Sequence, residues 1–278
     1  MLRFLLLISL LATFAFPGKS QQITAMTYNI RYDNPKDAPN AWDQRKDFLV
    51  SQVRFHAPVI MGVQEALKHQ LDYIDQAFPH YQYIGVGRDD GGQSGEFSAV
   101  FYDSEQVKLK DHGTFWLSPT PERPSKGWDA ALNRICTYGL FKPKGGKAFW
   151  VFNTHFDHIG QEARAESVKL ILEQIQAKNT KGYPVILMGD LNLTPDTDPI
   201  QLLANQMKDT FTTGNFPSLG PEGTFTGFSW DSEVKRRIDY IFVSPGVQPI
   251  QTAILTDSKN QRYPSDHFPV ISKLDLRD

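Results

Sequence analysis

Strand-like and helix-like patterns of apolar residues alternate along this chain. Residues 23–29 show the two-residue periodicity of a strand, which places Asn29 at the strand's end. Apolar side chains spaced three, four, seven or eleven residues apart predict amphipathic helices. These helices start near Trp42, cover about 67–78 and cover about 161–178.

Short apolar or β-branched runs predict the remaining strands, at 59–63, 135–141, 148–154, 184–188 and 238–243. Residues 142–147 form a turn between two of these runs and predict a hairpin. Because a hairpin joins antiparallel strands while helices connect the others, the sheet cannot be all parallel. No linker divides the pattern, so we expect one layered α/β domain over residues 21–278.

The segment 85–95 is rich in glycine and aspartate. It lacks a Gly-Lys-Ser/Thr ending and a following helix, so we interpret it as a mobile loop in preference to a phosphate cradle.

Residues 1–20 have the pattern of a cleavable secretory signal: a basic start, an apolar run over 4–16 and small residues at Gly18 and Ser20. The alternative is a membrane anchor, but the run is shorter than the ~20 apolar residues that span a bilayer. We therefore expect an exported, periplasmic or secreted bacterial protein, monomeric and without stable membrane insertion after the signal is removed.

Composition suits a large buried core, with 40% hydrophobic residues in a chain of 278. The single cysteine, Cys136, excludes an internal disulfide. It lies in a β-branched stretch, so we interpret it as a small buried hydrophobic residue and not as a nucleophile.

Charge argues against a protein that tracks along duplexes. Cleavage after Ser20 would remove Arg3 and Lys19 and leave 27 basic residues against 31 acidic, a net charge of −4. The one concentrated basic cluster is 235–237. Duplex binding depends on neutralising many phosphates, so this charge predicts few such contacts.

Polar groups suited to phosphate-ester hydrolysis stand at the predicted strand ends. They are Gln64-Glu65, Asn153-Thr154-His155, Gly189-Asp190-Leu191-Asn192, Asp239 and Ser265-Asp266-His267. Hydrolysis needs positive charge on the phosphate oxygens and an activated water. Glu65 and Asp266 are hard oxygen ligands of the type that Mg²⁺ prefers. Alternatively, Glu65 could be a surface carboxylate at the start of a helix, and Asp266 could be a turn residue.

His267 can exchange a proton near neutral pH, and a carboxylate beside it would fix its tautomer. Asp239 is our candidate, because an unpaired charge in an apolar strand is costly. The alternative is an ion pair between Asp239 and Arg236 or Arg237.

Asp190 and Asn192 fall on the same side of an extended segment, where they can orient an attacking water. The same Gly-Asp-x-Asn pattern also forms ordinary Asx-turns.

In their order, and with Asn29 in Thr27-Tyr28-Asn29-Ile30-Arg31, these segments resemble the endonuclease/exonuclease/phosphatase superfamily. The resemblance covers nearly all of the chain after residue 20, and it rests on the combination of motifs because none is specific alone. It implies a four-layer α/β sandwich, with two packed mixed β-sheets flanked by helices and a site where strand ends converge.

The resemblance also implies roles for the candidate residues. Asn29, Glu65 and Asp266 would hold Mg²⁺, with Mn²⁺ able to replace it. The catalytic set would be His155, Asp190, Asn192, Asp239 and His267. Substrate phosphate would contact Arg134, Asn192 and His155. The alternatives are a packed or surface role for His155 and a pairing of Arg134 with a surface acid.

The family includes nucleases, sugar and inositol phosphatases, lipid phosphodiesterases and RNA deadenylases, all with the same core chemistry. We predict a metal-dependent phosphodiesterase that uses water attack, with an exported nuclease first and nucleic acid among the candidate substrates. The alternatives are a sphingomyelinase-like enzyme or an inositol or sugar phosphate phosphoesterase, and then an inactive binding homologue. Leu187 and Asp239 depart from the usual inositol 5-phosphatase pattern, and His155 stands where abasic-site endonucleases place a tyrosine.

Overall fold

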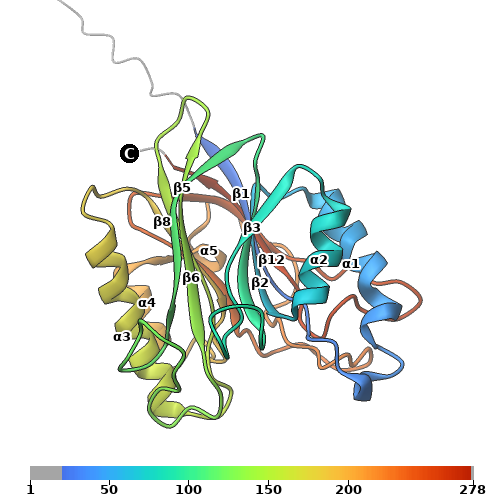
Figure 1. Cartoon of the computed structure of the whole chain (residues 1–278). Coiled ribbons are helices and arrows are strands. Elements are labelled where there is room, and N and C mark those ends of the chain that lie inside the picture. Colours follow the sequence, from blue (N-terminus) through green and yellow to red (C-terminus); the bar gives the residue numbers. More distant parts are fainter. Residues whose placement is uncertain (1–20, 277–278) are drawn as a thin grey trace, which may run out of the picture.

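The computed structural model describes residues 21–276 and shows two β-sheets packed face to face, with helices on both outer surfaces (Figure 1). This four-layer α/β sandwich is the fold class predicted above. The predicted signal, residues 1–20, lies outside the described residues. Within residues 21–276, none of the helices has the length and apolar character needed to cross a bilayer.

The first sheet has six strands in the order β11-β12-β1-β2-β4-β3. Their bounds are β1 Gln22–Asn29, β2 Ile60–Ala66, β3 Tyr81–Ile84, β4 Phe97–Asp103, β11 Gln248–Ile254 and β12 Val270–Asp275. β1 and β2 are parallel, whereas β12 runs antiparallel to β1.

The second sheet has the order β5-β6-β7-β8-β10-β9. Its strands are β5 Val107–Trp116, β6 Ile135–Pro143, β7 Phe149–His155, β8 Val185–Asp190, β9 Lys208–Asp209 and β10 Asp239–Val243. β6 and β7 form the predicted hairpin, and β7 and β8 are parallel. Both sheets are therefore mixed, as expected.

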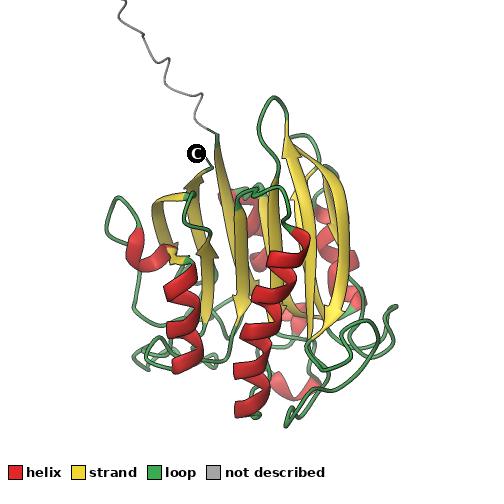
Figure 2. Ribbon diagram, turned by 90° about the vertical axis from the view of Figure 1, so that its left-hand side faces the viewer, coloured by secondary structure: helices red, strands yellow, loops and turns green. Residues whose placement is uncertain are grey.

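Helices cover the outer face of each sheet (Figures 1 and 2). α1 Trp42–His56 and α2 Lys68–Ala77 lie on the first sheet, and α3 Gln161–Lys178 and α4 Asp198–Gln206 lie on the second. A 3₁₀ turn, Pro35–Asp37, and the short α5, Thr210–Thr213, complete the described helices. The three helices predicted from apolar spacing are present close to their predicted bounds.

Strand β8 shows why a continuous apolar run is needed at the centre of the sandwich. Ile186 and Met188 face the core between the two sheets, while Val185 and Leu187 face the core beneath α3 and α4. A strand buried on both faces has no polar side to present, which explains the loss of alternation in the sequence. Cys136 is fully buried, and burial raises the pKa of its thiol, as expected for an inert side chain.

A polar seam joins the two sheets near one end. Asn153 of β7 donates to the carbonyl oxygens of Val63 and Ala99 in the other sheet, at 3.0 and 2.8 Å. Its Oδ1 accepts from Gln64 Nε2 at 2.6 Å. Gly62 makes this approach possible, because a Cβ there would lie 2.6 Å from Asn153 Oδ1. We call this set of contacts the inter-sheet seam.

Some elements were not anticipated from the sequence. β3, β4, β5, β11 and α4 have no counterpart among the predictions, and β10 begins at Asp239. Two of the motifs stand at the beginning of a strand and not after its last residue. Asp239 opens β10, and Asp266 and His267 precede β12, because both strands run antiparallel to their neighbours.

Candidate active site

The first sheet brings its polar motifs together at one edge. β1 and β2 pair Asn29 with Gln64, so Glu65 follows directly beside Asn29. β12 starts opposite Thr27 at the same end, and the loop that leads into it carries Asp266 and His267. The Ser265 hydroxyl ties this loop down by donating to the Asn29 carbonyl oxygen at 2.7 Å.

The second sheet adds its motifs at the same edge. β7 and β8 pair His155 with Asp190. β10 begins with Asp239 opposite Asp190. Since Asn29 Nδ2 donates to Asp190 Oδ2 at 3.0 Å, the polar groups of the two sheets are in direct contact.

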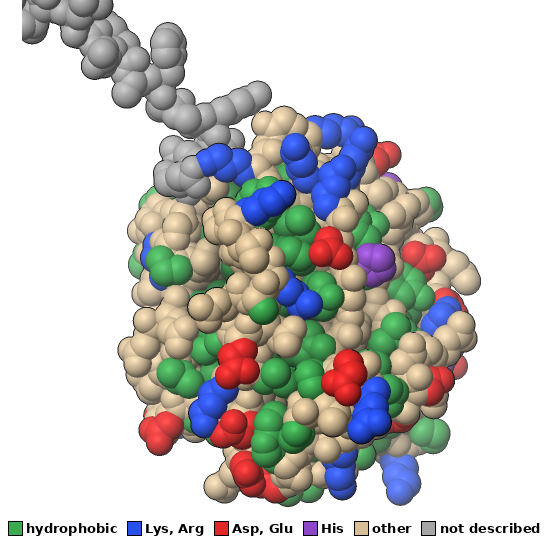
Figure 3. Space-filling model, turned by 60° about the vertical axis from the view of Figure 1, so that its left-hand side comes forward, with side chains coloured by type: hydrophobic (Ala, Val, Ile, Leu, Met, Phe, Trp, Pro, Cys, Tyr) green, Lys and Arg blue, Asp and Glu red, His purple; other side chains and the backbone are tan. Residues whose placement is uncertain are grey.

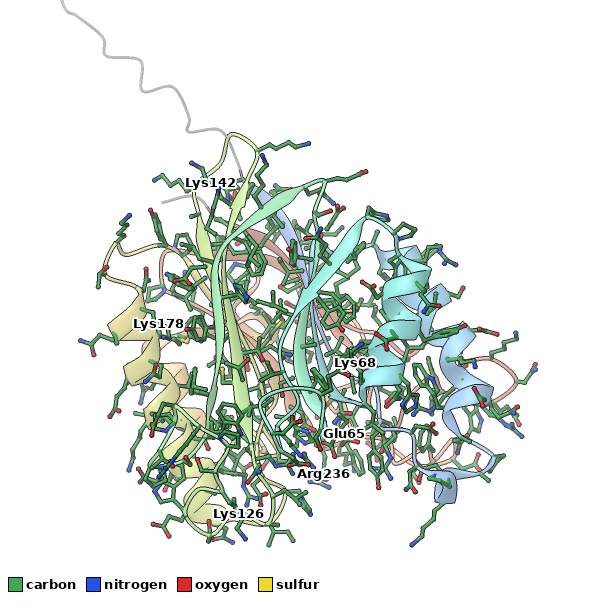
Figure 4. All side chains as sticks on the ribbon, viewed as in Figure 1. Glu65, Lys68, Lys126, Lys142, Lys178 and Arg236 are labelled. Carbon is green, nitrogen blue, oxygen red and sulfur yellow. The ribbon has the colours of Figure 1, made fainter. Side chains whose placement is uncertain are left out.

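These side chains line a pocket of about 850 Å³ at the lower end of the strands in Figure 4, where the labelled Glu65 and Arg236 lie. All nine residues predicted for the site are brought together here: seven line the pocket, and the other two contact that lining. The pocket is lined by Arg31, Tyr32, Glu65, Arg88, Glu96, Leu132, Arg134, His155, His158, Asp190, Asn192, Phe225, Arg236, Ile238, Asp266 and His267. Asn29 and Asp239 lie behind this lining, bonded to Asp190 and His267.

His267 and Asp239 form a buried pair. His267 Nδ1 lies 2.9 Å from Asp239 Oδ2. Burial lowers the pKa of His267, but the negative charges of Asp239 and Asp190 outweigh it and raise the pKa to about 10. The alternative pairing is wrong, because Arg237 Nη1 pairs with Asp209 at 2.7 Å.

Asp190 stands between the two sheets. Its Oδ1 accepts from the Asn192 backbone N–H at 2.9 Å, and its Oδ2 lies 3.8 Å from His267 Nε2. Burial and, after it, the charge of Asp239 raise the pKa of Asp190 to about 7, although the charge of His267 opposes this rise. A carboxyl group with a pKa near neutrality can exchange protons with a bound water.

His155 and Asn192 are hydrogen-bonded. The Asn192 side-chain N–H donates to the Phe156 carbonyl oxygen at 3.1 Å and points at His155 Nε2, 3.2 Å away. Burial lowers the pKa of His155 well below its usual value, and the charges of Arg134 and Arg88 lower it further. His155 is thus neutral, with Nε2 as acceptor and the proton on Nδ1.

Glu65 and Asp266 face the same guanidinium. Arg31 Nη1 lies 3.6 Å from Glu65 Oε2, and Arg31 Nε lies 3.8 Å from Asp266 Oδ2. Asn29 Nδ2 donates to Glu65 Oε1 at 3.1 Å. Burial raises the pKa of Asp266, and the charge of Glu65 raises it further. Arg31 is already bonded to Asp37, so these two carboxylates favour a further cation.

The donor set decides which group fits a divalent cation. Glu65 and Asp266 offer hard oxygens open to the pocket, as Mg²⁺ requires. Asp190, Asp239 and His267 also converge, with ligand atoms within 4.8 Å of one another. A histidine ligand has to be neutral, whereas the neighbouring carboxylates keep His267 protonated. The first set is therefore the better fit.

Three of the eight described non-glycine residues with positive φ line this pocket. Arg31, Glu65 and Asn192 all have positive φ, at 57°, 62° and 49°. Side chains with a Cβ rarely adopt this conformation, and it persists only where surrounding contacts enforce it. Strain at three residues of one pocket is typical of a functional site.

Arg134 pairs with a buried acid and not with a surface acid. Its Nε lies 3.3 Å from Asp157 Oδ2, and its Nη2 lies 3.0 Å from His158 Nδ1. Hydrogen bonds from the Ile159 and Gly160 backbone to Asp157 outweigh burial and lower the pKa of that carboxyl. Arg134 also lines the pocket, so a substrate bound there can reach it.

The sequence predictions missed several residues of the pocket. Arg88 lies within the glycine-rich segment 85–95 and Glu96 directly follows it, whereas Phe225 and Arg236 come from the loop before β10. A usable signal was the pair of opposite charges in and next to that segment. The loop that was interpreted as mobile therefore supplies pocket-lining side chains, while its mobility stays a prediction.

Basic side chains also gather at the opposite end of the molecule. Figure 3 shows them at the top of one face, where the turn between β6 and β7 carries Lys142, Lys144 and Lys147. Lys142 and Glu65 are labelled at opposite ends of the strands in Figure 4. This cluster is too far along the sandwich to help bind substrate at the site.

Comparisons with known proteins agree with the geometry. The model of the endonuclease/exonuclease/phosphatase family matches residues 26–267. A protein of that family from Bacteroides thetaiotaomicron has a TM-score of 0.89 and 39% identity, over 93% of this chain and 99% of that chain. A mannosyl-6-phosphatase of B. thetaiotaomicron VPI-5482 has a TM-score of 0.87 and 40% identity, over 91% and 99%. The uncharacterized protein L388 of Acanthamoeba polyphaga mimivirus is 27% identical over 72% of each chain.

Proposed function

The chain belongs to the endonuclease/exonuclease/phosphatase family, and from this membership we propose that it is a metal-dependent phosphatase that releases phosphate from a sugar phosphate. The observation that carries the proposal is the similarity, at 40% identity over 91% of this chain, to a mannosyl-6-phosphatase. The pocket volume of about 850 Å³ falls in the range of small-molecule sites.

The aromatic side chains of the pocket favour a small polar substrate over a nucleic acid. Proteins that bind single strands stack bases on open aromatic rings. Here the Arg31 guanidinium lies 4.5 Å from the Tyr32 ring centre, and that of Arg236 lies 5.2 Å from the Phe225 ring centre. Both rings are thus already stacked against a cation. The nuclease activity placed first from the sequence stays a prediction and becomes an arm of the test below.

Asp190 is the group suited to activate water. Its pKa of about 7 lets it accept a proton near neutral pH. The Asn192 backbone and the Asn29 side chain hold both of its oxygens in place. His267 cannot act as this base at neutral pH, because a protonated imidazole has no lone pair to offer.

His267 acts as a charged donor to the phosphate. Asp239 holds Nδ1, so Nε2–H points toward the pocket beside Asp190. A positive group fixed in a buried site stabilises the negative charge that develops on the phosphate oxygens. His155 lies on the other side of Asp190 and would need its other tautomer to donate from Nε2 to a phosphate oxygen.

Glu65 and Asp266, with Asn29, would hold the divalent cation. When bound, such an ion neutralises phosphate charge and helps the alcohol leave. Mg²⁺ is the ion we propose, with Mn²⁺ as a substitute. Arg31 sits between the two carboxylates and would share in binding the anionic phosphate.

The test is phosphate release by the purified protein with Mg²⁺ from mannose 6-phosphate, from an aryl phosphate, and from DNA and RNA. His267→Ala serves as the control for contaminating activity. We expect the monoesters to be hydrolysed and the loss of His267 to abolish it. Cleavage of nucleic acid without release of phosphate from any monoester would replace this proposal with the nuclease. Export of the protein also remains a proposal, to be checked by locating it in cell fractions.

A further inference from the structure

One wall of the pocket has no part in the chemistry described above. It begins beside the reacting groups, where Glu96 Oε2 lies 3.9 Å from His155 Nδ1. Its members all line the pocket and come from the loops after β3 and before β6, and from the turn after β7. They are Arg88, Glu96, Leu132, Arg134 and His158. We call this set the polar wall.

Arg88 and Glu96 form a two-pronged ion pair within the polar wall. Arg88 Nη1 donates to Glu96 Oε2 at 2.6 Å, and Arg88 Nη2 donates to Glu96 Oε1 at 2.9 Å. Burial raises the pKa of Glu96 to about 7, and this contact favours its ionised form. Trp116 Nε1 donates to the Arg88 carbonyl oxygen at 2.7 Å, which fixes the loop that carries the pair. The pair therefore presents a rigid set of donors and acceptors.

Buried donors of the polar wall and of the neighbouring His155 lack partners. Among the described residues, Arg134 Nη1, Arg88 Nε and His155 Nδ1 have no hydrogen-bond partner. The three side chains border a cavity of about 10 Å³ behind the main pocket, which has room for about one water. Unpaired buried N–H groups are costly, so the wall is built to receive oxygen atoms.

The charges of the polar wall decide whether it binds phosphate oxygens or hydroxyl oxygens. Arg88 is paired with Glu96, and Arg134 is paired with Asp157, so the wall has no excess of positive charge. A second phosphate would be repelled by Glu96 and would find no free guanidinium fork. Hydroxyl groups both donate and accept, and they match a surface that offers carboxylate oxygens beside N–H groups.

We infer that Arg88, Glu96 and Arg134 bind the hydroxyl groups of the substrate's sugar, so that the enzyme selects sugar phosphates over phosphates of alcohols without further hydroxyls. Leu132, whose exposed fraction is 41%, offers apolar contact for a C–H face of the ring. This inference rests on the proposed phosphatase activity, and it adds the means by which that activity chooses its substrate.

The experiment compares two phosphate monoesters that have the same phosphoryl group but different leaving groups. Steady-state kinetics with Mg²⁺ are measured on mannose 6-phosphate and on p-nitrophenyl phosphate, which has no hydroxyl groups. The variants are Glu96→Gln and Arg88→Lys, which keep size and hydrogen bonding but remove the ion pair or its fork. Glu105→Gln is the matched control, since Glu105 is exposed beyond the end of β4 that lies away from the pocket.

We expect each wall variant to lower kcat/KM for the sugar phosphate roughly tenfold to a hundredfold more than for the aryl phosphate, mainly through KM, because hydrogen bonds to charged groups are lost. The control leaves the ratio between the substrates unchanged. Monodeoxy sugar phosphates give a second measurement, since removing the hydroxyl that contacts Glu96 costs wild type more than it costs Glu96→Gln.

Equal losses on both substrates would overturn the inference and leave the wall with a structural role. The phosphatase proposal is tested separately, because it needs only Mg²⁺-dependent release of phosphate that His267→Ala abolishes. Thermal unfolding of each variant shows whether it is folded, and Arg88→Lys replaces Glu96→Gln if the latter is not.

Discussion

His267 Nδ1 lies 2.9 Å from Asp239 Oδ2, although 28 residues separate them in the chain. Asp239 is almost fully buried, and its carboxylate bonds to this imidazole behind the pocket lining. The carboxylate therefore acts by orienting His267 and holding it protonated.

We predict that the effects of Asp239→Asn and His267→Ala on kcat are not additive. Each change alone is expected to lower kcat by about 10²- to 10³-fold, the usual cost of removing a fixed donor that stabilises charge in the transition state. The double variant is expected to be no worse than His267→Ala, since the carboxylate has nothing left to orient. Two losses that multiply in the double variant would show that Asp239 has a separate role.

The same pair predicts how stability changes with pH. The pKa of His267 is about 10 in the folded protein, above the usual value of about 6.5 expected when unfolded. Folding therefore favours the protonated form, and this stabilisation is complete below about pH 6.5 and is lost as pH rises through about 10. The Tm difference between wild type and His267→Gln should shrink over this range in chelator. A constant difference would contradict the pairing.

Removal of divalent metal is predicted to abolish activity and to lower stability. A ligand that binds only the folded state at 100 times its Kd stabilises by about 2.7 kcal/mol. Mg²⁺ or Mn²⁺ should raise the Tm of wild type but not that of Glu65→Gln or Asp266→Asn, because those changes remove a charged oxygen ligand. Full activity in excess chelator would refute the requirement. If both variants kept the Tm rise, the ion would bind to a different set of residues.

Affinity for nucleic acid is predicted to be weak and only slightly salt-dependent. Each neutralised phosphate adds about 0.9 to the magnitude of the slope of log K against log salt on B-DNA. Lys235, Arg236 and Arg237 are adjacent in sequence, but Arg237 is buried against Asp209 and Arg236 lies over Phe225. Binding titrations at several salt concentrations should give a shallow slope of log K against log salt, which corresponds to only a few phosphate contacts. A slope matching six to ten would reveal an extended basic groove.

The inter-sheet seam is predicted to be essential for stability. Asn153→Leu would remove the side-chain donor to the Val63 and Ala99 carbonyl oxygens and one of the two acceptors of Gln64 Nε2, and each buried group left unpaired costs about 1 to 3 kcal/mol. Urea unfolding should report a loss of at least about 2 kcal/mol from these combined effects. Gly62→Ala should destabilise for a steric reason, because its Cβ would meet Asn153 Oδ1. A loss below 1 kcal/mol in both variants would show that the seam relaxes easily.

Much of the fold was accessible from the sequence because local pattern and burial agree. The central strand β8 is apolar from Val185 to Met188, and α3 shows a regular stripe, so both were predicted close to their bounds. β5 is largely exposed along its middle and carries an irregular register, so its alternation is too weak to recognise. The four residues of β3 are too few to show a period.

The site was only partly accessible. Asn29, Glu65, Asp190 and His267 stand in short motifs that carry their own signal. Arg88 and Glu96 do not, because their meaning arises when a loop folds against strands from the other sheet. The contact of Arg134 with Asp157 was missed for a similar reason: the partner lies in a turn that sequence reasoning left unassigned.

The pocket takes its residues from both sheets, and the inter-sheet seam joins these sheets. Glu65 belongs to the first sheet and Asp190 to the second, and Gln64, adjacent to Glu65, is one of the residues that bonds across to Asn153. The spacing between the cation ligands and the water-activating carboxylate is therefore set by how the sheets register on each other. A small slip at the seam would alter catalysis before any strand unfolds, so activity is a finer gauge of sheet alignment than any measurement of global unfolding.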